Sequence, residues 1–298
     1  MATPAPHYPF VTAVVNLKGG VGKTTLCVNL AYGLAYFNNK RVLLIDLDPQ
    51  ANATQYLISQ QSYSDVYLKT PPGKLSVHEL YEEYEPQAFG KSAPLADPQR
   101  YIQRIYDGSK SSCLDLVASK LELGLAAFKG GYTHSNAQIR WLVDSVAQNY
   151  DFVLIDCPPT VSRMLMAAFE ASQAVLIPTK PDFLSSIGLP LLYTVITNIY
   201  PNLARRPATW SDLRLLGIVY TMYDERYTMT KESQQDIAAE ARNMGCPVFN
   251  AHMSNSTKFA WSSKHSLPIF RTEPRSKYAA EVSDLAEEFI KHAESKSK

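Results

Sequence analysis

The stretch from Asn16 to Thr25, N-L-K-G-G-V-G-K-T-T, constrains the fold more than any other part of the sequence. It follows an apolar run from Phe10 to Val15 and precedes a helical pattern from Leu26 to Phe37. A glycine-rich turn between a strand and a helix lets successive backbone N–H groups point inward, and the helix N-terminus adds a positive dipole end. The order of strand, loop and helix therefore predicts a phosphate cradle for a nucleoside triphosphate, made by Gly19, Gly20, Val21, Gly22, Lys23, Thr24 and Thr25.

Two lysines distinguish this loop from the generic motif G-x-x-x-x-G-K-[ST]. Lys23 and Thr24 stand at the helix start, where they reach the terminal phosphates and a magnesium ion. The generic motif would place glycine five residues before Gly22, but Leu17 occupies that position and Lys18 follows it. Lys18 lies on the outer side of the loop and is poorly placed for the nucleotide of its own chain.

The loop K-G-G-V-G-K-T-T resembles that of the deviant Walker A ATPases typified by ParA and MinD. The resemblance implies that Lys18 reaches across a dimer to the partner's nucleotide, in a sandwich with two ATP molecules at the interface. It also implies catalytic roles for Lys18 and Lys23. The similarity spans Phe10–Leu57 and Leu114–Phe289, which is most of the chain.

A second run, Arg41 to Gln50, is a β-branched segment that ends in the carboxylates of Asp46 and Asp48. It is typical of a parallel strand that is buried on both faces, with functional groups at its C-terminal edge. Residues two apart on a strand point the same way, so both carboxylates can face the phosphate site. Alone, the pair is equally typical of a solvated strand end. The resemblance to the family motif D-x-D-P-Q-x-N implies that Asp48 orients the attacking water and that Asp46 lies in the outer shell of magnesium.

A third run, Asp151 to Pro159, is a hydrophobic strand that ends in Asp156 and continues into a pair of prolines. It follows a helical pattern over Asn136–Gln148. A strand that ends in Asp after a P-loop has the Walker B form, in which the carboxylate holds magnesium, usually through water. Asp156 is therefore the predicted magnesium residue, together with Thr24 and Asp46.

The remaining pattern alternates strands and helices. Strands are predicted at 114–119, 174–178 and 213–220, and helices at 185–200, 231–244 and 274–289. With phosphate, magnesium and water groups all at strand C-termini, the sequence predicts an α/β fold with a doubly wound, mostly parallel sheet flanked by helices, that of a P-loop NTPase. We expect a disordered leader at 1–9, a single ATPase domain at 10–292 and a polar tail at 293–298.

Residues 58–112 are the least family-like part, because periodicity weakens and proline and tyrosine accumulate. Pro71-Pro72-Gly73 indicates a turn, and short helices are predicted over Ser76–Tyr84 and Pro98–Tyr106. The tyrosines could form an adaptor-binding surface or could pack on a sheet edge.

Composition excludes several classes of protein. No apolar run approaches the roughly 18 to 20 residues of a membrane span, and the N-terminus lacks the basic start and apolar core of a signal peptide, so we expect a cytoplasmic protein. The four cysteines have no C-x-x-C spacing, which indicates buried, reduced thiols rather than disulfides or zinc. The net charge of +1 is too small for a stand-alone nucleic-acid binder, so DNA binding requires a local patch.

The resemblance also implies ligand contacts in the C-terminal third. Thr221 and Met222, at a strand end, and Pro268, in a segment similar to the family's "kPi" loop, would border the adenine. Arg242, Lys258 and Lys264 would contact DNA. Ordinary packing and ordinary solvated charges are the alternatives for these residues.

Three functional classes remain open. The favoured class is a ParA-type positioning ATPase that uses ATP and Mg²⁺, dimerises on ATP, binds DNA without sequence preference and hydrolyses ATP slowly until a ParB-like or other adaptor stimulates it. Such a protein would be cytoplasmic and nucleoid-associated when bound to ATP. The second class is a MinD-like membrane switch, but the C-terminal helix mixes Glu and Lys and lacks a bulky apolar face at its end, so no stable membrane association is expected. The third is a metabolic or redox relative. A redox relative needs paired cysteines that hold a metal cluster, which the four scattered cysteines do not supply, and a metabolic relative would not need Lys18.

Overall fold

The structure is a computed structural model that describes residues 7–69, 73–83, 97–124, 137–200, 213–224, 226 and 228–295. Its centre is a seven-stranded sheet in the order β3-β4-β2-β5-β1-β6-β7. The strands are β1 (Phe10–Val14), β2 (Arg41–Asp46), β3 (Ile102–Asp107), β4 (Cys113–Val117), β5 (Phe152–Asp156), β6 (Ala174–Thr179) and β7 (Arg214–Tyr220). All neighbouring pairs are parallel except β3 and β4, which are antiparallel. The predicted doubly wound, mostly parallel sheet is therefore confirmed.

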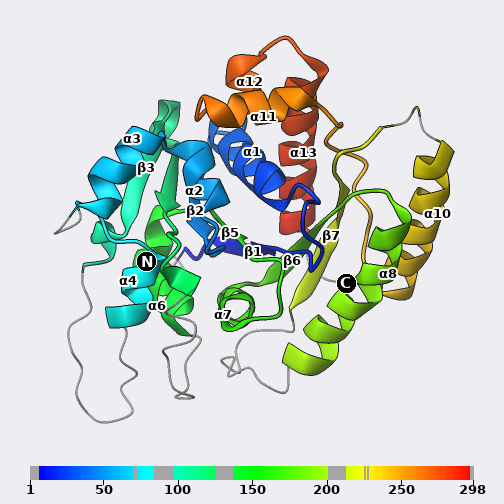
Figure 1. Ribbon diagram of the computed structural model, residues 1–298, viewed down its shortest axis with the longest axis horizontal. Helices are drawn as coiled ribbons and strands as arrows, with labels where there is room; N and C mark the ends of the chain where they lie inside the picture. Colours follow the sequence, from blue (N-terminus) through cyan, green and yellow to red (C-terminus); the bar gives the residue numbers. More distant parts are fainter. Residues whose placement is uncertain are drawn as a thin grey trace, which may run out of the picture.

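Helices cover both faces of this sheet (Figure 1). One face carries α1 (Lys23–Tyr36), α2 (Asn52–Leu57), α11 (Thr257–Lys264), α12 (Ile269–Thr272) and α13 (Lys277–Glu294). The other carries α4 (Val77–Glu83), α6 (Ala137–Val146), α7 (Arg163–Ala171), α8 (Phe183–Thr194) and α10 (Thr228–Asn243). Shorter elements are α3 (Gln60–Tyr63), π-helical segments at Ser64–Leu68 and Val195–Ile199, and 3₁₀ turns at Pro98–Arg100, Ser109–Ser111 and Ala147–Asn149.

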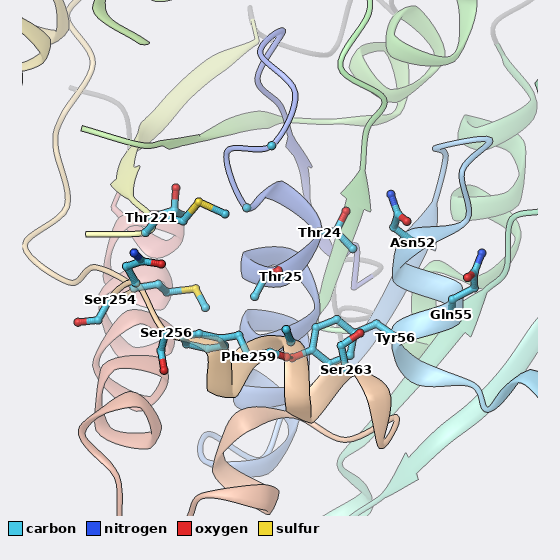
Figure 2. A pocket seen from close by; sticks show the side chains of 16 residues that line it. Thr24, Thr25, Asn52, Gln55, Tyr56, Thr221, Ser254, Ser256, Phe259 and Ser263 are labelled. Carbon is cyan, nitrogen blue, oxygen red and sulfur yellow. The ribbon is translucent and has the colours of Figure 1, made fainter. Parts of the chain in front are cut away.

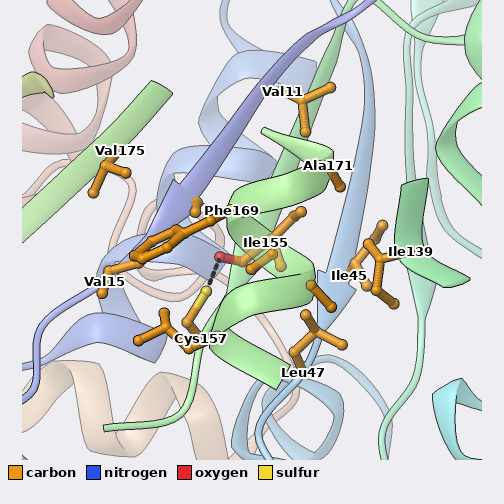
Figure 3. Close-up of a cluster of buried hydrophobic side chains, with 14 of the residues drawn as sticks. Val11, Val15, Ile45, Leu47, Ile139, Ile155, Cys157, Phe169, Ala171 and Val175 are labelled. Carbon is orange, nitrogen blue, oxygen red and sulfur yellow. Dashed lines mark hydrogen bonds between the residues drawn. The ribbon is translucent and has the colours of Figure 1, made fainter. Parts of the chain in front are cut away.

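The central strands are buried on both faces because each face contributes its own hydrophobic cluster. Figure 3 shows part of one cluster, which includes Phe169 of α7, Val11 of β1, Val15 just after β1 and Ile155 of β5. On the opposite face, residues of α1 pack with Val282 and Phe289 of α13. The two clusters hold the sheet rigid, and its carboxyl-terminal edge carries the loops that follow β1, β2 and β5.

Most elements agree with the sequence pattern, but one predicted helix is wrong. Pro98–Tyr106 contains only the 3₁₀ turn Pro98–Arg100, and Ile102–Asp107 forms the edge strand β3. The physical reason is pairing with the neighbouring strand, because Ile102–Asp107 runs antiparallel beside β4, and the ion pair between Arg104 and Asp115 spans the two strands. The helix predicted over Ser76–Tyr84 is present as α4, with Tyr84 outside the described residues.

The buried tyrosines of residues 58–112 pack in the hydrophobic core. Tyr67 and Tyr101 lie in the two hydrophobic clusters rather than on the surface. The turn predicted at Pro71-Pro72-Gly73 lies outside the described residues except for Gly73. Of the predicted leader, residues 1–6 also lie outside them, while the Tyr8 hydroxyl donates a hydrogen bond to Asp144 Oδ1 at 2.7 Å.

Two exclusions from the sequence can be compared with the structure. All four cysteines, at positions 27, 113, 157 and 246, are buried and unpaired, as predicted. Among the described helices, none combines the length and apolar character needed to cross a bilayer.

Candidate nucleotide-binding site

The loop between β1 and α1 is the segment for which the sequence predicts a phosphate cradle. Gly20 and Gly22 have φ of 70° and 77°, in the left-handed region that glycine adopts without a Cβ penalty. Gly22 precedes α1 and no side chain caps the helix there. The first N–H groups of α1 are therefore available to an anion, and the helix dipole favours one at this position.

Lys23 turns its ammonium back across the loop. Its Nζ donates a hydrogen bond to the carbonyl oxygen of Lys18 at 3.0 Å, and the side chain is buried. Burial lowers the pKa of Lys23, while the nearby carboxylates of Asp156 and Asp48 favour its charged form. This cation is thus placed between the loop backbone and the carboxylates at the sheet edge.

Asp156 and Asp46 end adjacent parallel strands in the same register, β5 and β2. Both are fully buried, and Asp156 Oδ2 accepts a hydrogen bond from Thr24 Oγ1 at 2.8 Å. Burial raises the pKa of Asp156 well above its usual range, and the carboxylate of Asp46 raises it further. Asp156 Oδ1 has no hydrogen-bond partner.

An unpartnered buried carboxylate oxygen beside a threonine hydroxyl fits a hard cation such as Mg²⁺. Mg²⁺ is commonly held by one or two carboxylates together with water and phosphate oxygens rather than by a complete protein cage. The described residues contain no group of three or more His, Cys, Asp or Glu side chains arranged as a metal site. Thr24 and Asp156 are therefore the residues best placed to hold a nucleotide-bound magnesium ion.

Asp46 uses both carboxylate oxygens inside the protein. Oδ2 accepts hydrogen bonds from Thr54 N at 2.8 Å and Thr54 Oγ1 at 2.7 Å, and Oδ1 accepts from Asp48 N at 3.2 Å. Burial raises the pKa of Asp46 to about 7, although the hydrogen bonds from Thr54 oppose the shift. The Thr54 hydroxyl also accepts from Ser119 N at 2.9 Å, which ties the start of α2 to the end of β4. In this arrangement Asp46 positions the loop that carries Asp48.

Asp48 lies on that loop and is nearly buried, and its Oδ1 accepts a hydrogen bond from Gln50 N at 2.9 Å. This Asx turn fixes the carboxylate just before α2. The position is compatible with the predicted water-orienting role, which stays a prediction.

Lys18 is tied to the start of α8 rather than to Thr24 or Asp156. Its Nζ donates hydrogen bonds to Asp182 Oδ1 at 2.7 Å and Oδ2 at 2.9 Å, and lies 3.4 Å from Ser185 Oγ. Asp182 also caps α8 by accepting from Ser185 N at 2.9 Å. The pattern D-x-x-S after β6 marks a helix N-cap, but the sequence did not identify Asp182 as the partner of Lys18.

A cavity of about 480 Å³ opens beside the cradle (Figure 2). Thr24 and Thr25 line one side, and Thr221 and Met222 line another, so two of the three predicted adenine contacts reach the cavity. Thr221 Oγ1 donates to the carbonyl oxygen of Val21 at 2.6 Å, which holds the end of β7 against the loop. The third predicted contact, Pro268, is buried at the start of α12 and is not part of the lining.

Several lining residues were missed by the sequence analysis. They come from α2, from the loop before α11 and from α11 itself: Gln55, Tyr56, Met253, Ser254, Asn255, Ser256, Phe259, Ala260 and Ser263. No local pattern marks these residues as lining a site, because only the fold brings them to the cradle.

The predicted DNA contacts do not form a single cluster. Lys258 and Lys264 lie on α11, whereas Arg242 lies in the last turn of α10, a separate helix at the edge of the molecule (Figure 1). Lys258 Nζ pairs with Glu273 Oε2 at 2.8 Å, which offsets its charge within the chain. Arg242 and Lys264 are exposed.

Comparisons with known proteins agree with this geometry. Residues 10–206 match the sequence profile of a family described as AAA domain. The chain is 29% identical over 279 residues to the sporulation initiation inhibitor protein Soj of Bacillus subtilis, covering 93% of this chain and 97% of that protein. It is 30% identical over 280 residues to the chromosome-partitioning ATPase Soj of Thermus thermophilus, covering 93% and 94%.

Solved structures show the same fold. Cobyrinic acid a,c-diamide synthase from Mycobacterium smegmatis, with a bound ATP analogue and magnesium, has a TM-score of 0.71 at 24% identity, covering 96% of each chain. Apo McdA from Cyanothece has a TM-score of 0.73 at 16% identity, covering 94% of this chain and 99% of that one. At such identities the likeness supports the fold alone.

Proposed function

The chain belongs to the AAA-domain family and is a partition-type P-loop ATPase related to Soj and ParA, and on this premise we propose that it is an ATP-dependent dimerising switch. In the proposed cycle, the protein binds ATP with Mg²⁺, dimerises, binds DNA without sequence preference, and is reset when a ParB-like or other adaptor stimulates hydrolysis. The switch would position or segregate DNA or another cargo. We assign the activity to one ATPase domain, residues 10–292, acting in the cytoplasm and on the nucleoid when bound to ATP.

The proposed chemistry follows from the cradle. The uncapped N–H groups of α1 and the Lys23 ammonium would bind the β- and γ-phosphates, and Thr24 and Asp156 would hold Mg²⁺. Magnesium supplies charge neutralisation on the phosphate oxygens when bound. Asp48 would orient the water whose oxygen attacks the γ-phosphorus, giving ADP and phosphate. Phosphoryl transfer needs mainly such positioning and electrostatic stabilisation, so we expect slow hydrolysis until a partner completes the site.

The observation that carries the dimeric part of the proposal is the place of Lys18. Its ammonium is bound to Asp182 at 2.7 Å, at the outer side of the loop, while Lys23 and Thr24 occupy the inner side. The Lys18 ammonium is thus held against the start of α8 and not beside Thr24 and Asp156. We therefore infer that Lys18 acts on the nucleotide of a second copy.

Sizing of Lys18→Ala and Lys23→Ala by light scattering with a non-hydrolysable ATP analogue tests this inference. Lys18→Ala is expected to keep nucleotide affinity within a few fold and to lose analogue-dependent dimers. Lys23→Ala is expected to lose nucleotide binding itself, which makes it the matched control. Lys18→Ala dimers as stable as those of the wild type would refute the role in trans.

The DNA-binding step needs the dimer because the chain carries a net charge of only +1. A few phosphate contacts by one copy release too few counterions to hold DNA at physiological salt, and a two-fold dimer doubles them. Arg242, Lys258 and Lys264 are all exposed, but the Lys258 ammonium is paired with Glu273, so Lys264 and Arg242 are the stronger candidates for DNA contacts. A MinD-like membrane role is less favoured, because the apolar face of α13 packs in the core, with Val282 and Phe289 fully buried.

A further inference from the structure

Helix α1 carries a polar side chain, Asn29, inside the hydrophobic core. Asn29 is fully buried, and its neighbours in the helix, Val28 and Leu30, are fully buried apolar residues. A buried amide costs stability unless its donors and its acceptor find partners, and asparagine is a weak helix former because it competes for backbone groups. The place of Asn29 in the core must therefore be explained by the groups to which its amide is bound.

The Asn29 amide binds three elements of the fold. Its Nδ2 donates to the carbonyl oxygen of Thr25 at 2.8 Å and to the hydroxyl oxygen of Tyr56 at 3.1 Å, and its Oδ1 accepts from Ile269 N at 3.0 Å. Thr25 belongs to α1, Tyr56 to α2 and Ile269 to the start of α12. Both N–H groups of the amide are thus used. One side chain joins three helices, two of which lie 27 and 240 positions away in the sequence.

The first turn of α12 uses Asn29 as its cap. Pro268 precedes this helix and makes no side-chain hydrogen bond to it, so the Asn29 oxygen supplies the acceptor for the Ile269 N–H at the helix start. The other end of α12 is joined to α11, because the hydroxyl oxygens of Ser262 and Thr272 lie 2.5 Å apart. Helix α12 is therefore tied to the core through Asn29 and to its surface neighbour through Thr272.

The helices around Asn29 also surround the cavity beside the phosphate loop. Thr25 of α1, Tyr56 of α2 and Phe259 of α11 line it (Figure 2). The Tyr56 hydroxyl also donates to the carbonyl oxygen of Phe259, at 3.5 Å. None of the described lining residues belongs to α12, so this helix can respond to a ligand only through its neighbours.

We propose that Asn29 is a positioning residue that transmits the occupancy of the cavity to α12. The proposal rests on the proposed function, in which the cavity takes a nucleotide, and it adds the connection from that site to the helices α11 and α12. A ligand that orders α2 orders the Tyr56 hydroxyl, which fixes the Asn29 amide and with it the acceptor of the Ile269 N–H. Without this amide α12 is still held by the buried side chains of Ile269 and Phe270, but its order no longer depends on the cavity.

Hydrogen exchange followed by mass spectrometry tests this connection on the full chain. Amide exchange in α12 and in the first turn of α1 is measured with and without a non-hydrolysable ATP analogue and Mg²⁺. The variants are Asn29→Leu, which has the same branching and no hydrogen-bonding group, and Tyr56→Phe, which removes one bond of the amide. Tyr150→Phe is the matched control, because it removes the hydroxyl of a buried tyrosine in the opposite hydrophobic cluster, where that hydroxyl donates to Asp115 Oδ2 at 2.7 Å.

In the wild type we expect the analogue to slow exchange in the first turn of α1 and, by about fivefold or more, in α12. Asn29→Leu should keep the effect at α1 and lose it at α12, Tyr56→Phe should weaken the effect at α12, and Tyr150→Phe should behave as the wild type does. A purely structural role of Asn29 predicts a different result. Exchange of α12 in Asn29→Leu would then be faster both with and without the analogue, with an unchanged ratio between the two, and that result overturns the inference.

Two further results separate this inference from the proposed function. A wild type in which the analogue protects α1 but leaves α12 unchanged overturns the inference, while nucleotide binding stands. If the analogue protects neither helix, nucleotide binding and the inference are both refuted. The comparison is repeated with Lys18→Ala, which is expected to stay monomeric, and loss of the α12 response in that variant would assign the response to the dimer and refute a connection through Asn29.

Discussion

Asp156→Asn should stabilise the nucleotide-free protein while removing its response to magnesium nucleotide. The Asp156 carboxylate is fully buried, it lies beside the carboxylate of Asp46, and its Oδ1 has no partner. Asparagine has the same shape, and its carbonyl oxygen can still accept the hydrogen bond that Thr24 Oγ1 donates at 2.8 Å. The substitution therefore removes a buried charge without removing its one hydrogen bond.

The magnitude follows from the cost of a poorly compensated buried charge. Replacing buried charged groups by neutral groups of similar volume is neutral or stabilises proteins by about 1–4 kcal/mol, from which the unpaired N–H of the asparagine amide subtracts, so a net gain of about 1 kcal/mol is expected. For a chain of this length that gain corresponds to a rise in Tm of about 2 °C. The pKa of Asp156 is raised by folding, so the charged form costs stability only above its unfolded pKa. The advantage of the variant should therefore grow as pH rises from about 4 through the folded pKa, and should vanish at lower pH.

Bound magnesium nucleotide should reverse the order of stability, so that wild type becomes more stable than Asp156→Asn. A nucleotide present at about a hundred times its Kd stabilises the native state by about 2.7 kcal/mol. Wild type should show that gain with Mg²⁺ and a non-hydrolysable ATP analogue, whereas Asp156→Asn should show little of it because the magnesium position is lost.

Thermal unfolding followed by circular dichroism gives the Tm of wild type and of Asp156→Asn at pH 5 and pH 8, with and without Mg²⁺ and the ATP analogue. Asp115→Asn is the control, because Asp115 is also buried but accepts hydrogen bonds from Arg104 and Tyr150, so this variant should be destabilised. An Asp156→Asn protein that melts below wild type at pH 8 without ligand, or that gains as much from the analogue, would refute the reasoning.

Three further outcomes are expected. Asp48→Ala should bind the ATP analogue and dimerise but stall in single-turnover hydrolysis, and full turnover would remove its water-orienting role. Thr54→Val should lose about 1–3 kcal/mol of stability in urea unfolding, because the buried Asp46 carboxylate loses the hydroxyl bond of 2.7 Å, whereas Thr54→Ser should restore most of it. The double variant Lys264→Glu, Arg242→Glu should still dimerise but lose binding to random duplex DNA, and an unchanged salt slope would place the DNA patch elsewhere.

The sequence predicted the frame of this molecule because its strong patterns are local. Buried parallel strands read as continuous β-branched runs, and the glycine-rich loop between β1 and α1 fixes their order. The prediction failed at Pro98–Tyr106, where a proline after Asp97 started a 3₁₀ turn and not a longer helix. Pairing with β4 makes this segment a strand, and no local sequence pattern contains that contact.

The site was predictable to the same degree. Residues within one motif, such as Lys23 and Thr24, were found from spacing alone. The partners of Lys18 and Asp46 were not found, since Asp182 is 164 positions from Lys18 and Thr54 lies on a helix that the sequence analysis did not predict. Pairs of this kind follow from the order of the strands, which places the ends of β1, β2, β5 and β6 along one edge.

That edge concentrates charge in a way that links stability to ligand. Asp46 and Asp156 are fully buried with folding-raised pKa values, and Lys23 is the buried cation beside them. One ammonium and the positive end of α1 offset these carboxylates only in part. On the proposed function, a bound magnesium nucleotide would place a cation next to Asp156 and phosphate oxygens next to Lys23, so that each buried charge would gain an opposite charge. Nucleotide binding is therefore expected to stabilise this edge, and a switch built on nucleotide binding requires such a difference between its two states.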